Sequence, residues 1–180
     1  MAKQFPKLND RLTTFIHDQP IFFVSTAPME GRVNCSPKGM DSLRVLGPNR
    51  IAWLNVTGSG NETAAHVLEN RRMTLMWCAF NGAPLILRAF GTARAVHPGD
   101  EDWADLSRRL PDQPGARQIF DMQMTMVQTS CGMAVPLLEH VEDRELLNDW
   151  ARKKDDAEML AYWEEKNTVS IDGLPTGIGQ

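Results

Sequence analysis

The alternation of hydrophobic and polar residues predicts a chain built mainly from β-strands, with helices between and around them. Apolar residues at helical spacing over residues 8–16 predict a first helix, which Pro20 ends. Two runs rich in aromatic and β-branched residues follow at 21–27 and 32–36, and the turn between them predicts a hairpin. We expect the second arm of this hairpin to break at residues 37–39, where Pro is followed by Lys and Gly.

The rest of the chain continues the same pattern of strands, glycine-containing turns and short helices. Further strands are predicted at 50–56, 73–80, 85–96 and 122–135. Helices are predicted from the turn after residue 56 to about 70, from 100 to 110, over 116–120, and from 142 to an irregular tail that starts at 170, with a break near 153–156. We expect about six antiparallel strands with peripheral helices, most simply a small six-stranded β-barrel. Without an internal repeat or a linker, residues 1–180 are predicted to form a single domain.

The turn between the strand at 50–56 and the following helix predicts an anion site. Gly58 and Gly60 allow positive φ angles and close backbone approach. Ser59 and Glu62 have the spacing of a capping box, and the helix behind them would direct free N–H groups at the turn. The alternative is that these residues only turn a strand into a helix. The turn has neither the P-loop pattern nor the full dinucleotide fingerprint.

Composition and charge narrow the function classes. The 19 basic and 23 acidic residues give a net charge of −4, which argues against nucleic acid as a partner. No apolar run is long enough for a membrane span and the start resembles no signal peptide, so we expect a cytoplasmic protein. Cys35, Cys78 and Cys131 lack metal-ligand spacing, and we expect reduced, buried thiols rather than a zinc site or disulfides.

The order of several short phrases resembles a known family. These phrases are Ser36-Pro37-Lys38-Gly39 after the hairpin, the strand Trp53-Leu54-Asn55 leading into the turn, the helix phrase at 65–70, and the strands at 73–77 and 87–93. Together they look like the FMN-binding split barrel of the pyridoxamine 5′-phosphate oxidase superfamily, over about residues 15–140. The phrases at 61–66, 127–132 and 171–175 are most similar to its predicted flavin-nucleotide-binding branch.

The resemblance implies FMN as cofactor and places its phosphate. Lys38, supported by Ser36, would bind the phosphate, which the turn residues Thr57, Gly58, Asn61 and Thr63 would wrap. The oxidases carry an Arg-Lys pair in this turn, and the chain has no positive charge there. Arg88 could supply the missing cation, and an ion pair on the barrel face is the alternative role for it. The alternative for Lys38 is that it is an ordinary surface lysine in a turn.

The resemblance also implies contacts to the flavin ring and a homodimer with two flavins at the interface. Backbone groups of Trp53, Leu54 and Asn55 would face the isoalloxazine edge. Gln128 and Ser130, with their neighbours Thr129 and Cys131, would approach the flavin from the partner subunit, although ordinary sheet packing explains this strand equally well.

Two functions from different classes follow from these expectations. The first is an FMN-dependent oxidoreductase acting on a small molecule, and the alternative is a flavin-binding or sensing module without turnover. Haem handling is a weaker possibility, since no histidine has the context of an axial ligand. We do not expect a genuine pyridoxamine phosphate oxidase, because the tail at 168–180 has no basic residue to hold the vitamin phosphate. The sequence assigns no catalytic residue and no substrate.

Overall fold

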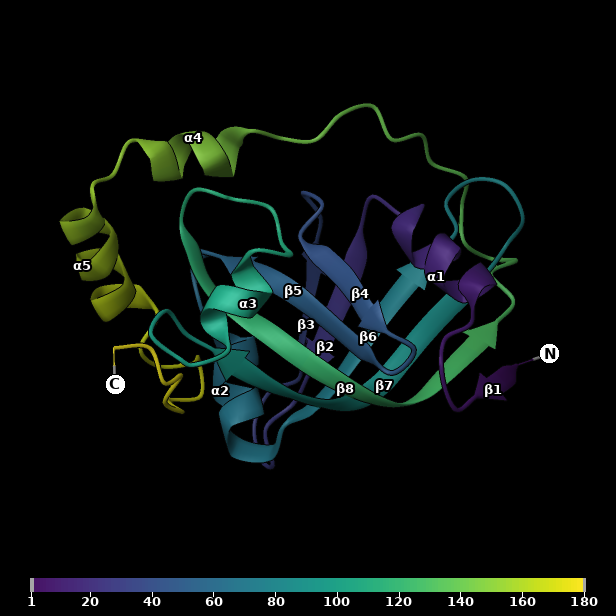
Figure 1. The fold of residues 1–180 in the computed structure, drawn as a ribbon, viewed down its shortest axis with the longest axis horizontal. Helices are drawn as coiled ribbons and strands as arrows, with labels where there is room; N and C mark the ends of the chain where they lie inside the picture. The colour runs from purple at the N-terminus through teal and green to yellow at the C-terminus, as the bar shows by residue number, and fades with distance from the viewer. Residues whose placement is uncertain (1, 180) are drawn as a thin grey trace.

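The computed structural model describes residues 2–179, and its centre is one antiparallel sheet of eight strands (Figure 1). The strand order is β3-β2-β6-β7-β8-β5-β4, and β1 pairs with the far part of β8. The strands are β1 (Lys3–Phe5), β2 (Phe22–Thr26), β3 (Asn34–Lys38), β4 (Leu43–Gly47), β5 (Arg50–Val56), β6 (Arg72–Cys78), β7 (Ile86–Val96) and β8 (Ala116–Ser130). The helices are α1 (Asp10–His17), α2 (Glu62–Asn70), α3 (Trp103–Ser107), α4 (Leu146–Arg152) and α5 (Asp156–Lys166).

The sheet curls around one hydrophobic core. Buried residues from β2, β5, β6, β7 and β8 meet there with Leu12 and Ile16 of α1. The edge strands β3 and β4 form no pairs with each other within residues 2–179, so the barrel stays split. The expectation of a mainly β split barrel with peripheral helices is therefore confirmed, but eight strands replace the expected six. The two additional strands, β1 and β4, are short, with three and five residues.

The sequence of strand β5 is apolar on both faces because both faces are buried. Ile51 and Trp53 point into the main core, whereas Ala52 and Leu54 belong to a second cluster beneath α3. Strand β6 is also apolar on both faces over residues 73–78. Its Met73, Leu75 and Trp77 are buried, but Thr74 and Met76 on the other face are only half-buried, so one face of β6 is covered less completely.

Several element boundaries differ from the sequence-based expectation. The last strand ends at Ser130 rather than at 135, and two further differences bear on the site. Residues 116–120 are not helical, because they begin the 15-residue strand β8, in which four consecutive residues from Arg117 to Phe120 are buried. Strand β3 does not break at Pro37 but continues through it to Lys38. Proline is tolerated there because β3 is an edge strand, where one side of the backbone needs no sheet partner.

The helices after β8 bring the C-terminal segment back to the sheet. Helix α5 starts with a capping box in which Asp155 and Glu158 bond each other's backbone N–H groups. The break between α4 and α5 lies where the sequence predicts it. Figure 1 shows a long extended segment that joins β8 to α4, and the chain that follows α5 lies near α2, where Ile171 donates to Glu62. No helix in the described part of the chain is long and apolar enough to span a bilayer.

The cysteines and the histidine of α2 have clear positions. Cys78 is buried, as expected, but Cys35 and Cys131 are exposed, because they lie at the open edge strand β3 and just beyond the end of β8. His66 is buried and its Nδ1 lies 3.0 Å from the hydroxyl of Thr26. This contact gives His66 a structural role, because it ties α2 to β2.

Candidate functional site

A cavity of about 530 Å³ opens beside the turn between β5 and α2, and we call it the Lys38 cavity. Four parts of the chain that are distant in sequence form it: edge strand β3, the turn with the start of α2, the start of β8, and the segment after α5. Six of the residues selected from the sequence line it. They are Ser36, Lys38, Asn55, Gly58, Asn61 and Thr63.

Lys38 reaches the cavity from the last position of β3. Its Nζ lies 5.5 Å from the centroid of the Trp53 ring, a distance that permits a cation–π interaction. Burial and the nearby charge of Arg117 lower the pKa of Lys38 to about 8. A lowered lysine pKa means that the surroundings disfavour the positive charge, and an anion in the cavity would reverse that effect.

Arg117 is the second cation of the cavity, and the sequence analysis missed it. The residue is 3% exposed, and its Nη1 donates to the carbonyl of Gly60 at 3.1 Å and to Oδ1 of Asn167 at 2.5 Å. Burial lowers its pKa to about 10, and its Nε has no hydrogen-bond partner within residues 2–179. Both acceptors are neutral, so the charge is buried without compensation. An arginine within a buried strand indicates a functional role, but the sequence pattern predicts residues 116–120 as a helix and so does not single out Arg117.

The turn itself is built differently from the prediction. Gly58 and Gly60 are not among the glycines with positive φ, and no capping box forms between Ser59 and Glu62. Instead, the carboxylate of Glu62 accepts the backbone N–H of Ile171 at 3.1 Å. Asn61 occupies the N-cap position, but its side chain exchanges two hydrogen bonds with Gln118. The amide of Asn61 therefore anchors the turn to β8, and the N–H groups at the start of α2 keep no side-chain cap.

Two neutral hydroxyl side chains complete the polar wall between β3 and α2. Asn34 links them, since its amide donates to Thr63 at 3.3 Å and its carbonyl oxygen accepts from Ser36 at 3.1 Å. Hydroxyls can rotate to donate to an anion, so this wall suits a ligand with several acceptor oxygens.

Three residues selected from the sequence are buried close to the cavity but do not line it. The Trp53 side chain is fully buried and stacks on Phe120, and its ring contacts the Lys38 ammonium. Backbone groups of Trp53 and Leu54 are used by the neighbouring strands, because β5 pairs with β4 on one side and β8 on the other. The hydroxyl of Thr57 donates to the carbonyl of Gly115 and accepts from the Trp163 indole, which holds α5 against the sheet.

The remaining three selected residues lie at the other end of the sheet. Arg88 of β7 pairs with Gln128 of β8 and donates to the hydroxyl of Ser130 at 3.2 Å. Arg117 lies near the opposite end of β8, so Arg88 does not supply a cation to the Lys38 cavity of its own subunit. Arg117 takes that place.

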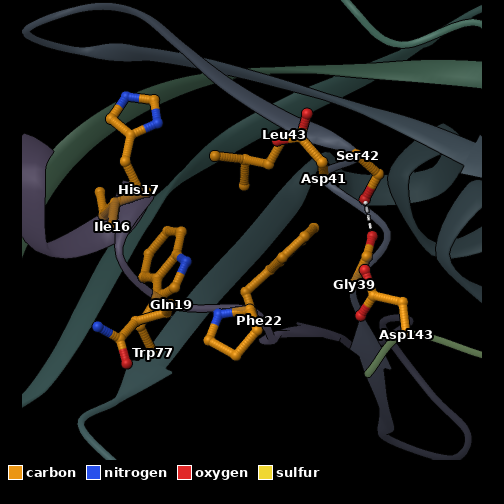
Figure 2. A pocket seen from close by; sticks show the side chains of 11 residues that line it. Ile16, His17, Gln19, Phe22, Gly39, Asp41, Ser42, Leu43, Trp77 and Asp143 are labelled. Atoms are coloured by element: carbon orange, nitrogen blue, oxygen red, sulfur yellow. Dashed lines mark hydrogen bonds between the residues drawn. The ribbon is translucent and has the colours of Figure 1, made fainter. Parts of the chain in front are cut away.

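A second, smaller cavity of about 200 Å³ lies between α1 and the turn that joins β3 to β4 (Figure 2). Phe22 and Trp77 stack beside it, and Ser42 closes the turn by donating to the carbonyl of Gly39 at 2.7 Å. Asp41 and Asp143 are among its lining residues, and neither lysine nor arginine is. This cavity therefore does not suit an anion.

The sequence profile of the pyridoxamine 5′-phosphate oxidase family matches residues 8–131. The chain belongs to this family. A family member from Aspergillus flavus, the protein ustO, is 36% identical over 189 residues, an alignment that covers 95% of this chain and 76% of ustO.

Solved structures show the same fold at low sequence identity. A variant of HupZ from group A Streptococcus matches with a TM-score of 0.55 and 17% identity, covering 68% of this chain and 98% of that one. The FAD binding protein from Mycobacterium smegmatis and the heme storage protein HutZ from Vibrio cholerae each match with a TM-score of 0.50, at 12% and 16% identity. They cover 70% and 71% of this chain, and 97% and 98% of their own chains.

Proposed function

We propose that the chain binds FMN with its phosphate in the Lys38 cavity and is a flavin-dependent oxidoreductase acting on a small molecule. One observation carries this proposal: Lys38 and Arg117 bring two poorly hydrated positive charges to one cavity, and neither forms an ion pair within residues 2–179. Burying a charge without a partner is costly, so a site of this kind is expected to have an anionic ligand.

The donors of the cavity fit a phosphate monoester. The guanidinium of Arg117 has a free Nε–H, the start of α2 offers backbone N–H groups with the positive end of the helix dipole, and Ser36 and Thr63 add hydroxyls. Glu62 is the one acid of the lining, and its hydrogen bonds to the backbone of Ile171 hold the carboxylate on the C-terminal segment.

FMN, when bound, supplies the redox chemistry, and the protein supplies binding and orientation. Lys38 and Arg117 would hold the phosphate end, and Trp53 would keep the Lys38 ammonium in place through its ring face. The chain's similarity to an FAD binding protein and to a heme storage protein concerns the fold alone. A phosphate ligand is favoured over haem here because the described lining contains three basic residues, Lys38, Arg117 and the exposed Lys166, and no histidine.

The most direct test identifies the chromophore that copurifies with the protein, by absorbance and mass. We expect a yellow protein that releases FMN on denaturation, and steady-state oxidation of NAD(P)H would establish turnover. A colourless protein that also fails to bind added FMN would overturn the proposal. Tight FMN binding with no turnover would instead identify a flavin-binding or sensing module.

A matched pair of variants tests the position of the phosphate. Lys38→Ala should weaken FMN binding by about 2 to 5 kcal/mol, the typical cost of truncating one partner of a desolvated charge pair, while riboflavin binding barely changes. Thr63→Ala should show the same discrimination more weakly, since only a neutral hydroxyl is lost. Equal losses for both flavins in Lys38→Ala would show that the lysine supports the ring or the fold.

Membership of the family does not by itself make the chain a pyridoxamine phosphate oxidase. The oxidases hold the vitamin phosphate with a basic C-terminal segment, whereas residues 168–180 of this chain contain no lysine or arginine. We expect no appreciable formation of pyridoxal phosphate, and production at an ordinary enzymatic rate would overturn this expectation.

We also propose that the protein is a homodimer with flavin sites at the interface. The segment between β8 and α4, together with the first residue of α4, supports this, because Met133, Leu137, Val141 and Leu146 are each more than 70% exposed on the single chain. Figure 1 shows this segment running in extended form away from the sheet. Apolar side chains gathered on one exposed segment are typical of an interaction surface.

A further inference from the structure

The C-terminal segment 167–178 forms part of the wall of the Lys38 cavity next to Arg117. Asn167 is fully buried, where it accepts from Arg117 and donates through its amide to the carbonyl of Gly58 at 3.1 Å. The hydroxyl of Thr176 in turn donates to the carbonyl of Asn167 at 2.6 Å. The wall of the cavity next to Arg117 is therefore formed in part by a segment with its own hydrogen-bond network.

Two attachments hold this segment from outside. Glu62 of α2 accepts the backbone N–H of Ile171. Asp172 accepts both the backbone N–H and the guanidinium of Arg32 in the hairpin between β2 and β3. The segment is thus tied to two of the other elements that build the cavity.

Resting on the proposed function, we propose that this segment makes the site selective for FMN over FAD. In FMN the phosphate has three unesterified oxygens, and in FAD one of these carries the adenylyl group. A phosphate that meets Arg117 presents those three oxygens to the wall that residues 169–171 help to form. The adenylyl group of FAD would then have to displace this wall. Asn167 is a positioning residue in this scheme, since it orients Arg117 from behind the wall.

Calorimetric titration of the intact protein with FMN, FAD and riboflavin tests the proposal. We expect wild type to bind FMN at least about 100-fold more tightly than FAD, because a dinucleotide must displace the wall. The double variant Glu62→Ala/Asp172→Ala removes both outer attachments while leaving Lys38 and Arg117 in place. We expect its FMN preference to fall about tenfold, mainly through tighter FAD binding.

A control variant, a second wall variant and a hydrogen-exchange measurement complete the test. Asp105→Asn, which breaks an exposed ion pair on α3, is the matched control and should leave the preference unchanged. Asn167→Ala removes the bridge itself and should also lower the preference. Hydrogen exchange over residues 167–178 should slow when FMN binds to wild type, because the ligand stabilises the wall.

The outcomes separate this inference from the function on which it rests. Phosphate-dependent FMN binding with equally tight FAD binding in wild type would overturn the selectivity of the segment and leave the proposed function intact. An unchanged preference in both the double variant and Asn167→Ala would do the same. A wild-type protein that binds no flavin would overturn both.

Discussion

The burial of charged Lys38 lowers the free energy of unfolding of the flavin-free protein. Its pKa is lowered from 10.5 to about 8, by burial first and by Arg117 second, so the folded state disfavours the charged form. Below pH 8 the lysine is charged in both the folded and unfolded states, and the folded state carries the full penalty. Between about pH 8 and 10.5 the folded state loses its proton first, and the penalty disappears as the pH rises.

Lys38→Met should therefore stabilise the flavin-free protein at pH 7. The shift of about 2.5 units corresponds to about 3 kcal/mol, and loss of the cation–π contact with Trp53 offsets about 1 kcal/mol of that. We expect a net gain of about 1 to 2 kcal/mol in the free energy of unfolding, measured by urea denaturation. The gain should shrink at pH 10. A variant that is less stable than wild type at pH 7 would show that the lysine is already compensated.

The same titration predicts a pH dependence of FMN affinity. A phosphate monoester is mostly a dianion above pH 6 to 7, so its own charge is constant where Lys38 titrates. Deprotonation of Lys38 removes one of the two cations, and we expect FMN affinity to fall as the pH rises above about 8. Riboflavin affinity, followed by fluorescence titration over the same range, should stay constant. A parallel decline for riboflavin would assign the effect to another group.

At this scale the sequence predicted one cation and missed the other. Lys38 was found through the phrase Ser36-Pro37-Lys38-Gly39, which the resemblance marks out. Arg117 has no such phrase, and its role depends on its contacts with the backbone carbonyl of Gly60 and with the side-chain oxygen of Asn167, which is 50 residues away. A contact between distant segments cannot be read from local spacing. The same reason explains why Glu62 bonds Ile171 rather than forming the predicted capping box.

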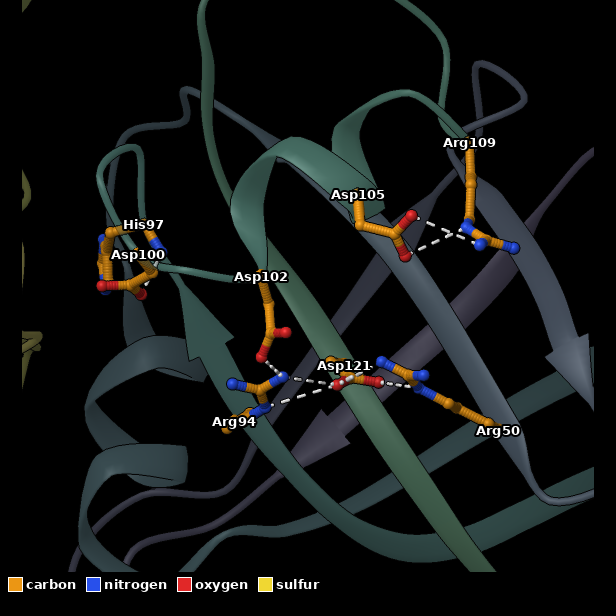
Figure 3. A network of polar contacts seen from close by, with 8 residues as sticks. All are labelled: Arg50, Arg94, His97, Asp100, Asp102, Asp105, Arg109 and Asp121. Carbon is orange, nitrogen blue, oxygen red and sulfur yellow. Dashed lines mark hydrogen bonds and ion pairs between the residues drawn. The ribbon is translucent and has the colours of Figure 1, made fainter.

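Helix α3 is attached to the sheet by an ionic network centred on Asp121 of β8 (Figure 3). The Asp121 carboxylate accepts from Arg50 of β5 at 2.8 Å and from Arg94 of β7 at 3.0 Å, and Arg94 also pairs with Asp102 at the start of α3. Burial of Asp121 acts to raise its pKa, but the hydrogen bonds and charges of the two arginines outweigh burial, and its pKa is lowered.

Asp121→Asn should destabilise the fold by about 1 to 3 kcal/mol. The Asp121 side chain is 11% exposed and its partners are about 45% exposed, so the effect should lie between the 3 to 5 kcal/mol of a buried pair and the 1 kcal/mol of a surface pair. Thermal unfolding at pH 7 measures it. Asp105→Asn, with both partners 55% exposed, should change stability by less than about 0.5 kcal/mol.

The acid side of the stability curve provides an independent check on Asp121. Because its folded pKa is lowered, its contribution is present above its ordinary value of 3.8 and is lost as the pH falls through the folded value. The difference between wild type and Asp121→Asn should therefore narrow below pH 4. A constant difference from pH 7 to pH 3 would mean that the loss reflects packing rather than charge.

The positions of β2, β5 and β7 were predicted within about one residue, but the start of β8 was not. Strands β2 and β7 alternate between buried and half-exposed residues, and their positions follow from the sequence within about one residue. The start of β8 is buried on both faces because the main core lies on one side and the cluster beneath α3 on the other. Its continuous run of buried residues has no two-residue period, which led to the incorrect helix at 116–120.

On the scale of the whole molecule, the two groups of selected residues lie at opposite ends of β8. Arg117 and the Lys38 cavity are at its start, and Gln128 and Ser130 are at its finish. An extended strand advances about 3.3 Å per residue, so up to about 40 Å of strand separates them. One flavin could contact both groups only if the second group came from another copy of the chain, as the resemblance implies and as we propose for the homodimer.

A mixed dimer tests this arrangement directly. Lys38→Ala should lose FMN binding at the phosphate, and the double variant Gln128→Ala/Ser130→Ala should lose it from the partner's side. When two differently tagged chains carry these changes separately, a two-fold dimer contains one site with both defects and one intact site. We expect the purified mixed dimer to bind one FMN per dimer with wild-type affinity, measured by titration and sedimentation. Binding at neither site would place both groups in one subunit's site, and a wild-type monomer with full affinity would exclude the shared site altogether.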